Sequence, residues 1–469
     1  MSQTLYHSQP YFSLIFLILF RVKLLTSLSR PTTGIILAAG LGTRMCSSRP
    51  KAMHPLAGQP MLTHLLINAA KVFDTVVVVV GPGMDEVVQL AKPFPTVVQT
   101  ERLGTAHAAL QAEAFFGHGD VAILYADNPL ISAPTLTRLI HERHQPDVSL
   151  ALLAMRPTNP GRYGRVITVN GSVSRIVEWN DATEEERAIP LCNAGVFCAD
   201  STNLRRWLHA VDNNNTKREF YLTDIVGISI AEHALVKAVE APEEELRGIN
   251  SRAELALAEA SVQQRLRTQA LELGVTLIAP ETVFFSVDTV LAPDVLIEPH
   301  VIFGPGVTIS EGAVIRAFSH LEGCFIQSES VIGPYARIRP KTSIGTHSKV
   351  GNFVELKNAT LGDHTKINHL SYVGDATIGT QSNIGAGTIF CNYDGTHKHH
   401  TTIGEHVFVG SDSVLVAPLC IGDHAFVAAG STITNNVPPE AMAFGRARQE
   451  NRNGYGKHFK NSCKTKKRT

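Results

Sequence analysis

Residues 331–350 read VIGPYARIRPKTSIGTHSKV and place an aliphatic side chain at every sixth position, from Ile332 to Val350. The same spacing continues on both sides, with two five-residue steps and two longer gaps, at Ile297, Phe303, Ile309, Ile315, Ile338, Ile344, Leu356, Leu361, Ile367, Val373, Ile378, Ile384, Phe390, Ile403, Val409, Leu415, Ile421, Val427 and Ile433. A period of six matches neither a strand nor an α-helix, and it is typical of a solenoid. Three hexads make one triangular coil, whose aliphatic side chains point inward and stack on the coil below. We therefore predict a β-helix domain over residues 275–450.

The chain before this domain, from residue 34 to 249, alternates strands with helices. Three short apolar runs have the composition of buried strands: GIILAAG (34–40), TVVVVVG (75–81) and VAILYAD (121–127). The stretches 60–73 and 104–116 between them have apolar residues at helical spacing. Such alternation predicts a parallel sheet with helices on both faces. Ligands of such a sheet bind beyond the carboxyl ends of the strands.

The segments that flank these domains differ in character. Residues 250–274 are rich in Ala, Leu, Glu and Arg and end at a glycine, which predicts one long linker helix. Residues 1–33 form an extension whose apolar run at 11–20 has no Lys or Arg before it and no small-residue cleavage site after it. We expect a disordered extension or a mis-assigned start, and a targeting or membrane role is the alternative. Residues 451–469 are a basic C-terminal tail, which we expect to be solvated and disordered.

The charge balance excludes whole classes of partner. Lys plus Arg and Asp plus Glu number 42 each, so no electrostatic excess favours nucleic acid or stable association with a membrane. A local cluster of basic residues can still bind a small anion. The seven cysteines are scattered and form no CxxC pair, which favours a reducing compartment over a disulfide framework or a zinc site. We therefore expect a cytoplasmic protein.

A glycine-rich turn follows the first predicted strand, in LAAGLGTRM at 37–45, and RPK comes shortly after it at 49–51. Backbone N–H groups in such a turn can donate to phosphate oxygens, because glycine lets the ligand approach closely. Arg44 and Lys51 can neutralise a triphosphate and its leaving pyrophosphate. The spacing differs from the GxxxxGK[ST] pattern, so the motif does not indicate a P-loop kinase.

LAAGLGTRM and the following RPKAMHPLAG resemble the signature of sugar-nucleotide pyrophosphorylases. With the hexads behind them, residues 34–450 resemble the bacterial bifunctional family of N-acetylglucosamine-1-phosphate uridylyltransferases and glucosamine-1-phosphate N-acetyltransferases. The resemblance implies an α/β protein with a Rossmann-like nucleotidyltransferase domain, a linker helix and a left-handed parallel β-helix. It implies acetyl transfer from acetyl-CoA to glucosamine 1-phosphate, then Mg²⁺-dependent uridylyl transfer from UTP to N-acetylglucosamine 1-phosphate. The product, UDP-N-acetylglucosamine, is a precursor of peptidoglycan and lipopolysaccharide. The resemblance also implies a homotrimer with acetyl-CoA sites between subunits.

The same resemblance assigns residues to the uridylyltransferase site. Lys51 and Arg44 are implied to stabilise charge as a phosphate oxygen of the sugar phosphate attacks the α-phosphorus of UTP. Asp127 and Asn250 are implied to bind the metal, and the segment VQTERLGTAHA, which begins at Val98, is implied to hold the uracil. The implied substrate-binding residues are Leu37, Ala38, Ala39, Gly40, Lys51, Gln99, Gly104, Thr105, Tyr125, Ala126, Asp127, Gly164, Glu178, Asn193 and Asn250.

A cluster of polar residues interrupts the hexads, although a solenoid face needs none for stability. The segment NHLSYVGD resembles the family's acetyltransferase site and implies that His369 is the general base, a role that suits imidazole near neutral pH. Glu355 is implied to orient or charge His369, and Arg339 and Lys357 to bind the sugar phosphate. Sugar-positioning residues are implied at Tyr372, Asn383, Asn392 and Tyr393, and acetyl-CoA-binding residues at Ala386, Ser411, Ala429 and Arg446.

Two other functions stay open at this stage. The β-helix could be purely regulatory or oligomerising, as in ADP-glucose pyrophosphorylases, or the whole chain could be a non-catalytic scaffold subunit. The His369 cluster argues against the first alternative, and the intact Arg44, Lys51 and Asp127 argue against the second. Three positions depart from the family pattern: Arg49 stands where Leu is usual, Ala126 where Gly is usual and Ala194 where Thr is usual.

Overall fold

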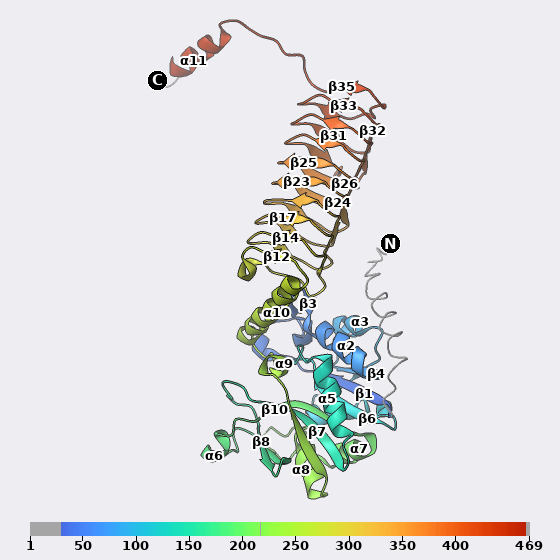
Figure 1. The fold of residues 1–469 in the computed structure, drawn as a ribbon, viewed down its shortest axis with the longest axis vertical. Coiled ribbons are helices and arrows are strands. Elements are labelled where there is room, and N and C mark those ends of the chain that lie inside the picture. The colour runs from blue at the N-terminus through green and yellow to red at the C-terminus, as the bar shows by residue number, and fades with distance from the viewer. Residues whose placement is uncertain (1–29, 216, 466–469) are drawn as a thin grey trace. The chain divides into compact units, whose positions relative to one another are not determined.

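The computed structural model describes residues 30–215 and 217–465. The chain divides into two compact units, Met1–Val262 and Gln263–Thr469, and the boundary falls inside helix α10 (Arg252–Glu272) (Figure 1). Our expectations for the apolar run at 11–20 fall outside the described residues. Among the residues that are described, no helix is long and apolar enough to cross a membrane.

The first unit is built on a nine-stranded sheet with the main order β11-β7-β10-β6-β1-β4-β5. Its strands are β1 (Thr32–Leu37), β4 (Thr75–Val80), β5 (Thr96–Val98), β6 (Asp120–Tyr125), β7 (Val148–Met155), β8 (Arg165–Val169), β9 (Ser172–Val177), β10 (Cys192–Asp200) and β11 (Leu235–Glu240). Strands β1, β4 and β6 pair in parallel, as predicted. Strand β10 runs antiparallel to both β6 and β7, so the sheet is mixed rather than wholly parallel.

Helices cover both faces of this sheet. One face packs against α2 (Met61–Val72), α3 (Asp85–Ala91), α5 (Ala133–Arg143) and α9 (Glu243–Leu246), and the other against α4 (Thr105–Leu110), α7 (Ser201–Ala210) and α8 (Asp224–Ala231). The two faces therefore have separate apolar cores, which explains the unbroken valine run of β4. With both faces covered, the carboxyl ends of the strands are left as the place where a ligand can enter.

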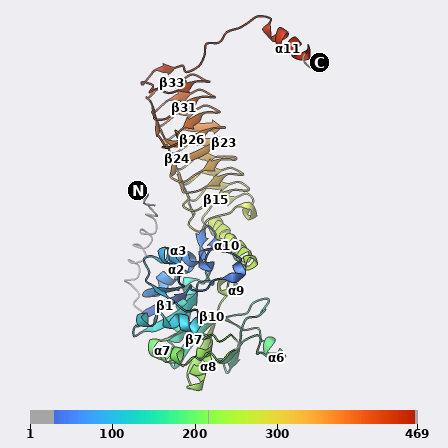
Figure 2. The ribbon, with the colours of Figure 1, turned by 180° about the vertical axis from the view of Figure 1, so that it is seen from behind.

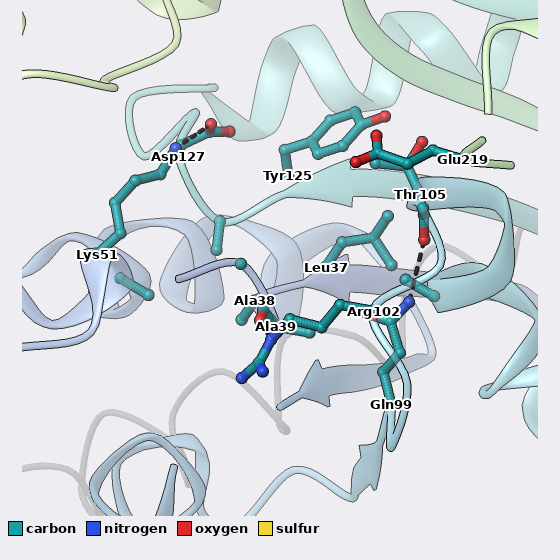
Figure 3. Close-up of a pocket in the computed structure, with 15 residues that line it drawn as sticks. Leu37, Ala38, Ala39, Lys51, Gln99, Arg102, Thr105, Tyr125, Asp127 and Glu219 are labelled. Carbon is teal, nitrogen blue, oxygen red and sulfur yellow. Dashed lines mark hydrogen bonds and ion pairs between the residues drawn. The ribbon is translucent and has the colours of Figure 1, made fainter. Parts of the chain in front are cut away.

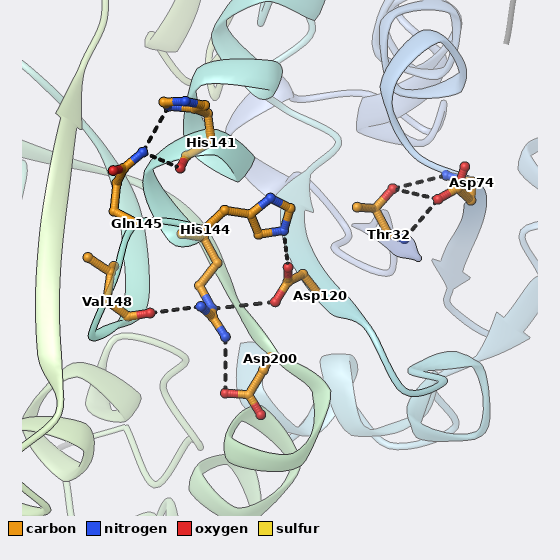
Figure 4. Close-up of polar contacts among 9 residues, drawn as sticks. Thr32, Asp74, Asp120, His141, His144, Gln145, Val148 and Asp200 are labelled. Atoms are coloured by element: carbon orange, nitrogen blue, oxygen red, sulfur yellow. Dashed lines mark hydrogen bonds and ion pairs between the residues drawn. The ribbon is translucent and has the colours of Figure 1, made fainter. Parts of the chain in front are cut away.

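A buried polar network holds the start of β6 (Figure 4). The carboxylate of Asp120, only 1% exposed, lies 2.5 Å from Nε2 of His144 and 3.4 Å from Nε of Arg143. Arg143 also pairs with Asp200 at the end of β10, at 3.4 Å. Because an unpaired buried carboxylate would cost several kcal/mol, about 3–5, these partners keep the strand in place. The other end of β6 leads directly to the predicted site residues Tyr125–Asp127.

The linker helix predicted over 250–274 is confirmed as α10 (Arg252–Glu272). It ends where predicted, because Gly274 adopts a left-handed conformation with φ of +88°. The amide of Val275 donates to the carbonyl of Ala270 at 3.0 Å and so satisfies one of the last helical carbonyls.

The second unit is a parallel β-helix, whose stacked coils are seen from behind in Figure 2. One face is a ladder of ten strands: β12 (Thr276–Leu277), β14 (Leu296–Ile297), β17 (Val314–Ile315), β20 (Val331–Ile332), β23 (Lys349–Asn352), β25 (Lys366–His369), β27 (Asn383–Ile384), β30 (Phe408–Val409), β33 (Phe426–Val427) and β35 (Met442–Ala443). In this ladder Ile315 pairs with Ile332, which pairs in turn with Val350. Each of these side chains is 0% exposed. The predicted inward stacking of hexads is therefore confirmed.

The remaining strands form a fourteen-stranded sheet that covers the other faces. They are β13 (Val290–Leu291), β15 (Ile302–Phe303), β16 (Thr308–Ile309), β18 (His320–Leu321), β19 (Cys324–Ile326), β21 (Arg337–Ile338), β22 (Thr342–Ile344), β24 (Glu355–Leu361), β26 (Tyr372–Ile378), β28 (Ile389–Cys391), β29 (Thr401–Ile403), β31 (Val414–Val416), β32 (Leu419–Ile421) and β34 (Thr432–Ile433). Strands β24 and β26, each seven residues long, are the longest of the set, and they carry the predicted acetyltransferase residues Glu355, Lys357 and Tyr372.

The C-terminal tail differs from our prediction of disorder, because it contains helix α11 (Tyr455–Thr465). This segment has no proline, and three of its eleven residues are lysines, which favour helix. Tyr455 and Phe459 are 56% and 63% exposed, so the helix gains little stability from packing.

Candidate active sites

A pocket of about 250 Å³ opens at the carboxyl ends of β1 and β6 (Figure 3). Eleven of the predicted uridylyltransferase residues line it: Leu37, Ala38, Ala39, Gly40, Lys51, Gln99, Gly104, Thr105, Tyr125, Ala126 and Asp127. The structure therefore brings together residues from four segments that the motifs selected separately.

The glycine-rich turn has the room that a phosphate would need. A side chain built on Gly40 would meet no atom within 4 Å. Gly42 has a φ of +64°, and a side chain there would come within 2.6 Å of Cβ of Lys51. The absence of a side chain at Gly42 thus lets the stem of Lys51 cross the turn and reach the pocket.

The ammonium group of Lys51 lies between the two predicted metal ligands, Asp127 and Asn250. Nζ of Lys51 lies 2.5 Å from Oδ2 of Asp127 and 2.8 Å from Oδ1 of Asn250, and Figure 3 shows Lys51 and Asp127 pointing toward each other. Arg44 lies outside the pocket wall, but its Nη2 donates to the same Asn250 oxygen at 2.8 Å. The backbone joins the two ligand segments, because the amide of Ile249 donates to the carbonyl of Asp127 at 2.8 Å.

These groups fit a magnesium ion. A carboxylate and an amide oxygen are hard ligands that converge on one positive charge, and Mg²⁺ is commonly held by one or two carboxylates together with substrate phosphates and water. Within the described ranges no group of three or more His, Cys, Asp or Glu side chains could hold a metal ion. Asp127 and Asn250 would therefore hold Mg²⁺ together with the nucleotide.

The segment predicted to hold the base is tightly fixed. Gln99 is 3% exposed, and its Nε2 donates to the carbonyl of Gly104 at 3.0 Å. Gly104 has a φ of +123°, and a side chain there would lie 2.5 Å from the carbonyl oxygen of Phe220. Oγ1 of Thr105 accepts from the amide of Leu222 at 2.9 Å. Only glycine fits at 104, which explains why the motif needs it.

Arg102 lines the same pocket and was missed by the sequence analysis. Its Nε donates to the carbonyl of Ala39 at 2.8 Å and so ties the base segment to the phosphate turn. Any side chain at Gly81 would lie 2.4 Å from its Nη2, so that glycine makes room for the guanidinium. Its position two residues before Gly104, inside the quoted motif, was the available signal. Glu219, Ala52 and Ala108 also line the pocket without having been predicted.

Gly164, Glu178 and Asn193 form a second group beside the pocket. The amide of Asn193 donates to the carbonyl of Gly164 at 2.9 Å, and a side chain at Gly164 would lie 3.5 Å from Oε1 of Glu178. Asn193 also accepts from the amide of Gly195 at 2.9 Å, and a side chain at Gly195 would meet the ring of Tyr125 at 2.8 Å. This group therefore continues the site beyond Tyr125.

Burial raises the pKa of two groups here. The pKa of Tyr125 is raised above its ordinary value by burial, and the nearby charges of Asp127 and Glu178 add to the shift, while a hydrogen bond with Thr105 opposes it. Its phenol stays protonated at neutral pH. The pKa of Glu178 is raised by loss of water around its carboxyl group and by the charges of Asp181 and Asp224.

Among the three departures from the family pattern, only Ala126 touches the pocket, and it is 4% exposed. Arg49 is exposed, and Ala194 packs in the apolar core of the sheet.

The predicted acetyltransferase residues lie on successive coils of the β-helix, where the ladder of β23 and β25 adjoins β24 and β26. His369 ends β25 and stacks in register on Asn352 of β23, and its Nδ1 lies 2.6 Å from Oδ1 of Asn352. A carbonyl oxygen only accepts, so in this arrangement Nδ1 carries the proton and Nε2 keeps its lone pair. The sequence analysis did not single out Asn352, which lies 17 residues from His369 along the chain.

Glu355 does not contact His369 as expected. Its Oε1 lies 2.8 Å from Nη1 of Arg339, and Asn352 is the partner of the histidine. The register explains the difference, because Glu355 opens β24 and pairs with Tyr372, whereas His369 on the neighbouring face pairs with Asn352 of the adjacent coil.

Three cations gather beside β24. The pKa of Lys357 is lowered by a hydrogen bond with Lys398, by burial and by the charges of Lys398 and Arg339, while Asp375 opposes the shift. Lys398 comes from the loop after β28, where its backbone bridges Tyr393. It was not predicted, although it is the one lysine in that loop's CNYDGTHKHH. Like charges this close favour a bound anion.

The other predicted residues lie on neighbouring coils. Nδ2 of Asn392 donates to Oδ2 of Asp375 at 2.5 Å. The hydroxyl of Tyr372 and Nδ2 of Asn392 both lie beside Gly374, which is the strand partner of Lys357. Tyr393 is 60% exposed and donates to the carbonyl of Gly395 at 2.6 Å.

The predicted acetyl-CoA residues follow one another on successive coils. Asp412 donates from its amide to Ala386 at 2.7 Å, and Gly430 donates to Ser411 at 2.8 Å. Asn383 begins β27, one coil above Lys366, and Ala429 and Arg446 lie beside Ser411 and Gly430.

Comparisons with known proteins cover both units. Residues 34–194 match the model of the MobA-like NTP transferase domain, and residues 320–437 match that of the GMPPB C-terminal domain. A protein of Gluconacetobacter diazotrophicus named Bifunctional protein GlmU is 63% identical over 442 residues, which cover 93% of this chain and 96% of that protein. Proteins of the same name from Granulibacter bethesdensis and Gluconobacter oxydans are 61% and 59% identical, over 90% and 94% of this chain and 94% and 99% of their own lengths. The chain therefore belongs to the family of bifunctional GlmU proteins.

Proposed function

We propose that this chain makes UDP-N-acetylglucosamine in two steps at two separate sites. Glucosamine 1-phosphate is acetylated by acetyl-CoA, and the product then reacts with UTP in the presence of Mg²⁺ and releases pyrophosphate. The observation that carries the proposal is that one chain holds two distinct reactive sets, Lys51 with Asp127 and Asn250 in one unit, and His369 with Asn352 in the other.

In the uridylyl site, a phosphate oxygen of the sugar phosphate bonds to the α-phosphorus of UTP as the bond to the departing pyrophosphate breaks. Lys51 and Arg44 stabilise the negative charge that builds up, and Arg102 holds the glycine-rich turn against the base segment. Mg²⁺ bound by Asp127 and Asn250 would neutralise further phosphate charge.

In the acetyl site, Nε2 of His369 takes a proton from the amine of glucosamine 1-phosphate as the amine attacks the thioester carbon. The carbon–sulfur bond breaks, and the departing sulfur takes the proton back from His369, so the coenzyme leaves as its thiol. Asn352 holds the imidazole in the required tautomer, and Glu355 holds Arg339. Arg339, Lys357 and Lys398 bind the sugar phosphate. Tyr372, Asn383, Asn392 and Tyr393 position the sugar, and Ala386, Ser411, Ala429 and Arg446 bind acetyl-CoA.

A coupled assay tests the whole proposal. Purified protein receives glucosamine 1-phosphate, acetyl-CoA, UTP and Mg²⁺, and free thiol and pyrophosphate are followed separately. We expect both products, and we expect chelation of Mg²⁺ to stop only pyrophosphate release because the acetyl site needs no metal. Pyrophosphate that appears only with added N-acetylglucosamine 1-phosphate would reduce the β-helix to an oligomerising module. Absence of both products would point to a scaffold.

We further propose that the working form is a homotrimer with acetyl-CoA bound between subunits, as the family resemblance implies. An exposed stack of rings on the β-helix supports it: His300, Phe318, Tyr335 and Phe353 follow one another at 4.8, 4.9 and 5.2 Å between ring centroids. Phe318, Tyr335 and Phe353 are 50%, 47% and 55% exposed. A contiguous apolar patch of this kind on a protein surface marks an interaction site.

Light scattering on the purified protein is expected to give three times the chain mass. Phe353→Glu should lower the mass, because it buries a charge in the interface, whereas Phe325→Glu, 42% exposed but outside the stack, should not. A monomeric wild type would contradict this part of the proposal.

A further inference from the structure

We propose that Arg165 is a positioning residue for the sugar-phosphate half of the uridylyl site. The inference rests on the proposed function and adds to it a residue that touches neither the base nor the phosphate turn. Arg165 opens β8 and is among the largest fully buried side chains, at 1% exposure.

The guanidinium of Arg165 donates four hydrogen bonds, all to backbone carbonyls. Its Nε donates to Arg187 at 3.2 Å, its Nη1 to Pro160 at 3.4 Å and to Tyr163, and its Nη2 to Gly161 at 3.2 Å. Its centre also lies 5.0 Å from the ring of Trp179. One side chain therefore joins the loop before β8 to the segment that follows β9.

No carboxylate lies within ion-pair distance of Arg165 in the part of the chain that the structure describes. A buried charge without a counter-ion is costly, and carbonyl dipoles and the Trp179 ring offset the cost only while both segments keep their shape. Arg165 therefore restrains both segments, because a movement of either one would take carbonyl partners away from its buried guanidinium.

The two segments that Arg165 joins carry Gly164 and Glu178, and its strand partner on β10 precedes Asn193. Gly164 is its chain neighbour, Glu178 precedes Trp179, and Asn193 follows Cys192, the strand partner of Arg165. The amide of Asn193 donates to Gly164 at 2.9 Å, so all three residues sit on the scaffold that Arg165 holds.

Gly164, Glu178 and Asn193 are available to bind the sugar phosphate, because the nucleotide is expected to occupy the pocket itself. The pocket walls from β1, from the segment around Gly104 and from β6 already hold the proposed base and phosphate contacts, and none of Gly164, Glu178 and Asn193 lines that pocket. The group continues the site beyond Tyr125, where a second substrate would extend from the reacting phosphate.

Steady-state kinetics of Arg165→Lys test the inference in the full-length protein. Lysine keeps the charge but cannot donate to several carbonyls at once, so we expect the KM for N-acetylglucosamine 1-phosphate to rise about tenfold while the KM for UTP changes less than about twofold. Trp179→Phe, which keeps Arg165 and weakens the ring contacts of Arg165 and Arg187, should shift the same KM in the same direction by a smaller factor. Arg175→Met is the matched control, because Arg175 is exposed on the neighbouring strand β9 and pairs with Glu186.

The outcomes separate the possibilities. Equal increases in both KM values, or a lower melting temperature with unchanged kinetic constants, would mean that Arg165 only stabilises the fold and would overturn the inference. If Arg165→Lys does not fold, the Trp179→Phe result decides. A wild type that releases thiol but no pyrophosphate would overturn the proposed uridylyl function and this inference with it, whereas an active wild type with unaltered sugar-phosphate KM in both variants would overturn the inference alone.

Discussion

His369→Ala is expected to slow acetyl transfer by about 10²- to 10⁴-fold and to leave uridylyl transfer within about twofold of wild type. The amine of glucosamine 1-phosphate attacks efficiently only when a base removes its proton. Nε2 of His369 can be that base, because the hydrogen bond of Nδ1 with Asn352 leaves the lone pair of Nε2 available. The measurement is thiol release from acetyl-CoA, with pyrophosphate release from the same preparation as the internal comparison.

His364→Ala is the matched control for this variant. His364 is exposed on the same coil and stacks on His347 at 5.0 Å, away from the cation cluster, so its loss should change neither activity. Asn352→Ala should give an intermediate loss of acetyl transfer, because the imidazole stays but its tautomer is no longer held. Full acetyl transfer by His369→Ala would remove His369 from the mechanism.

Asp127→Ala is expected to lower uridylyl transfer by about 10³-fold and to leave acetyl transfer unchanged. The substitution removes one of the two oxygens that meet at the ammonium of Lys51, so the proposed metal site loses its carboxylate and Lys51 keeps only Asn250 as a partner. Pyrophosphate release at saturating UTP is the measurement, repeated over a range of Mg²⁺ concentrations.

Asp85→Ala serves as the control, since Asp85 is an exposed carboxylate of the same unit at the start of α3. Loss of both activities in Asp127→Ala, in protein that melts at the wild-type temperature, would show that the two sites are coupled and would contradict the two-site proposal. Retention of Mg²⁺-dependent uridylyl transfer would instead place the metal elsewhere.

Much of the fold could be predicted because its signals are local. The hexads predict their own coil, since each aliphatic residue pairs in register with its equivalent one coil away, as Ile332 does with Val350. The linker helix was visible in its composition and its terminal glycine. The antiparallel direction of β10 could not be predicted, because its residue pattern does not indicate the direction of a strand. The helix α11 was not predicted, because the basic composition of the tail favoured disorder.

The sites were predicted in part. Motif residues such as Lys51 and Asp127 were found because the resemblance covers them, and the structure brings them together. Arg102 was missed although it lies within the quoted segment VQTERLGTAHA, Lys398 was not singled out, and the hydrogen bonds of Glu355 with Arg339 and of His369 with Asn352 were not foreseen. These errors have one source, which is that a motif names residues without saying which of them touch.

By itself, the sequence determined the hexad solenoid, the strand–helix alternation and the residue types of both sites, because each is written in spacing along the chain. The tertiary structure alone decided which groups meet. Arg102 reaches Ala39 across 63 residues, and the ammonium of Lys51 reaches Asn250 across 199. Such contacts depend on how strands pair and where loops end. A hydrogen bond needs its two atoms within about 3 Å of each other, and a periodic pattern along the sequence does not specify positions so finely.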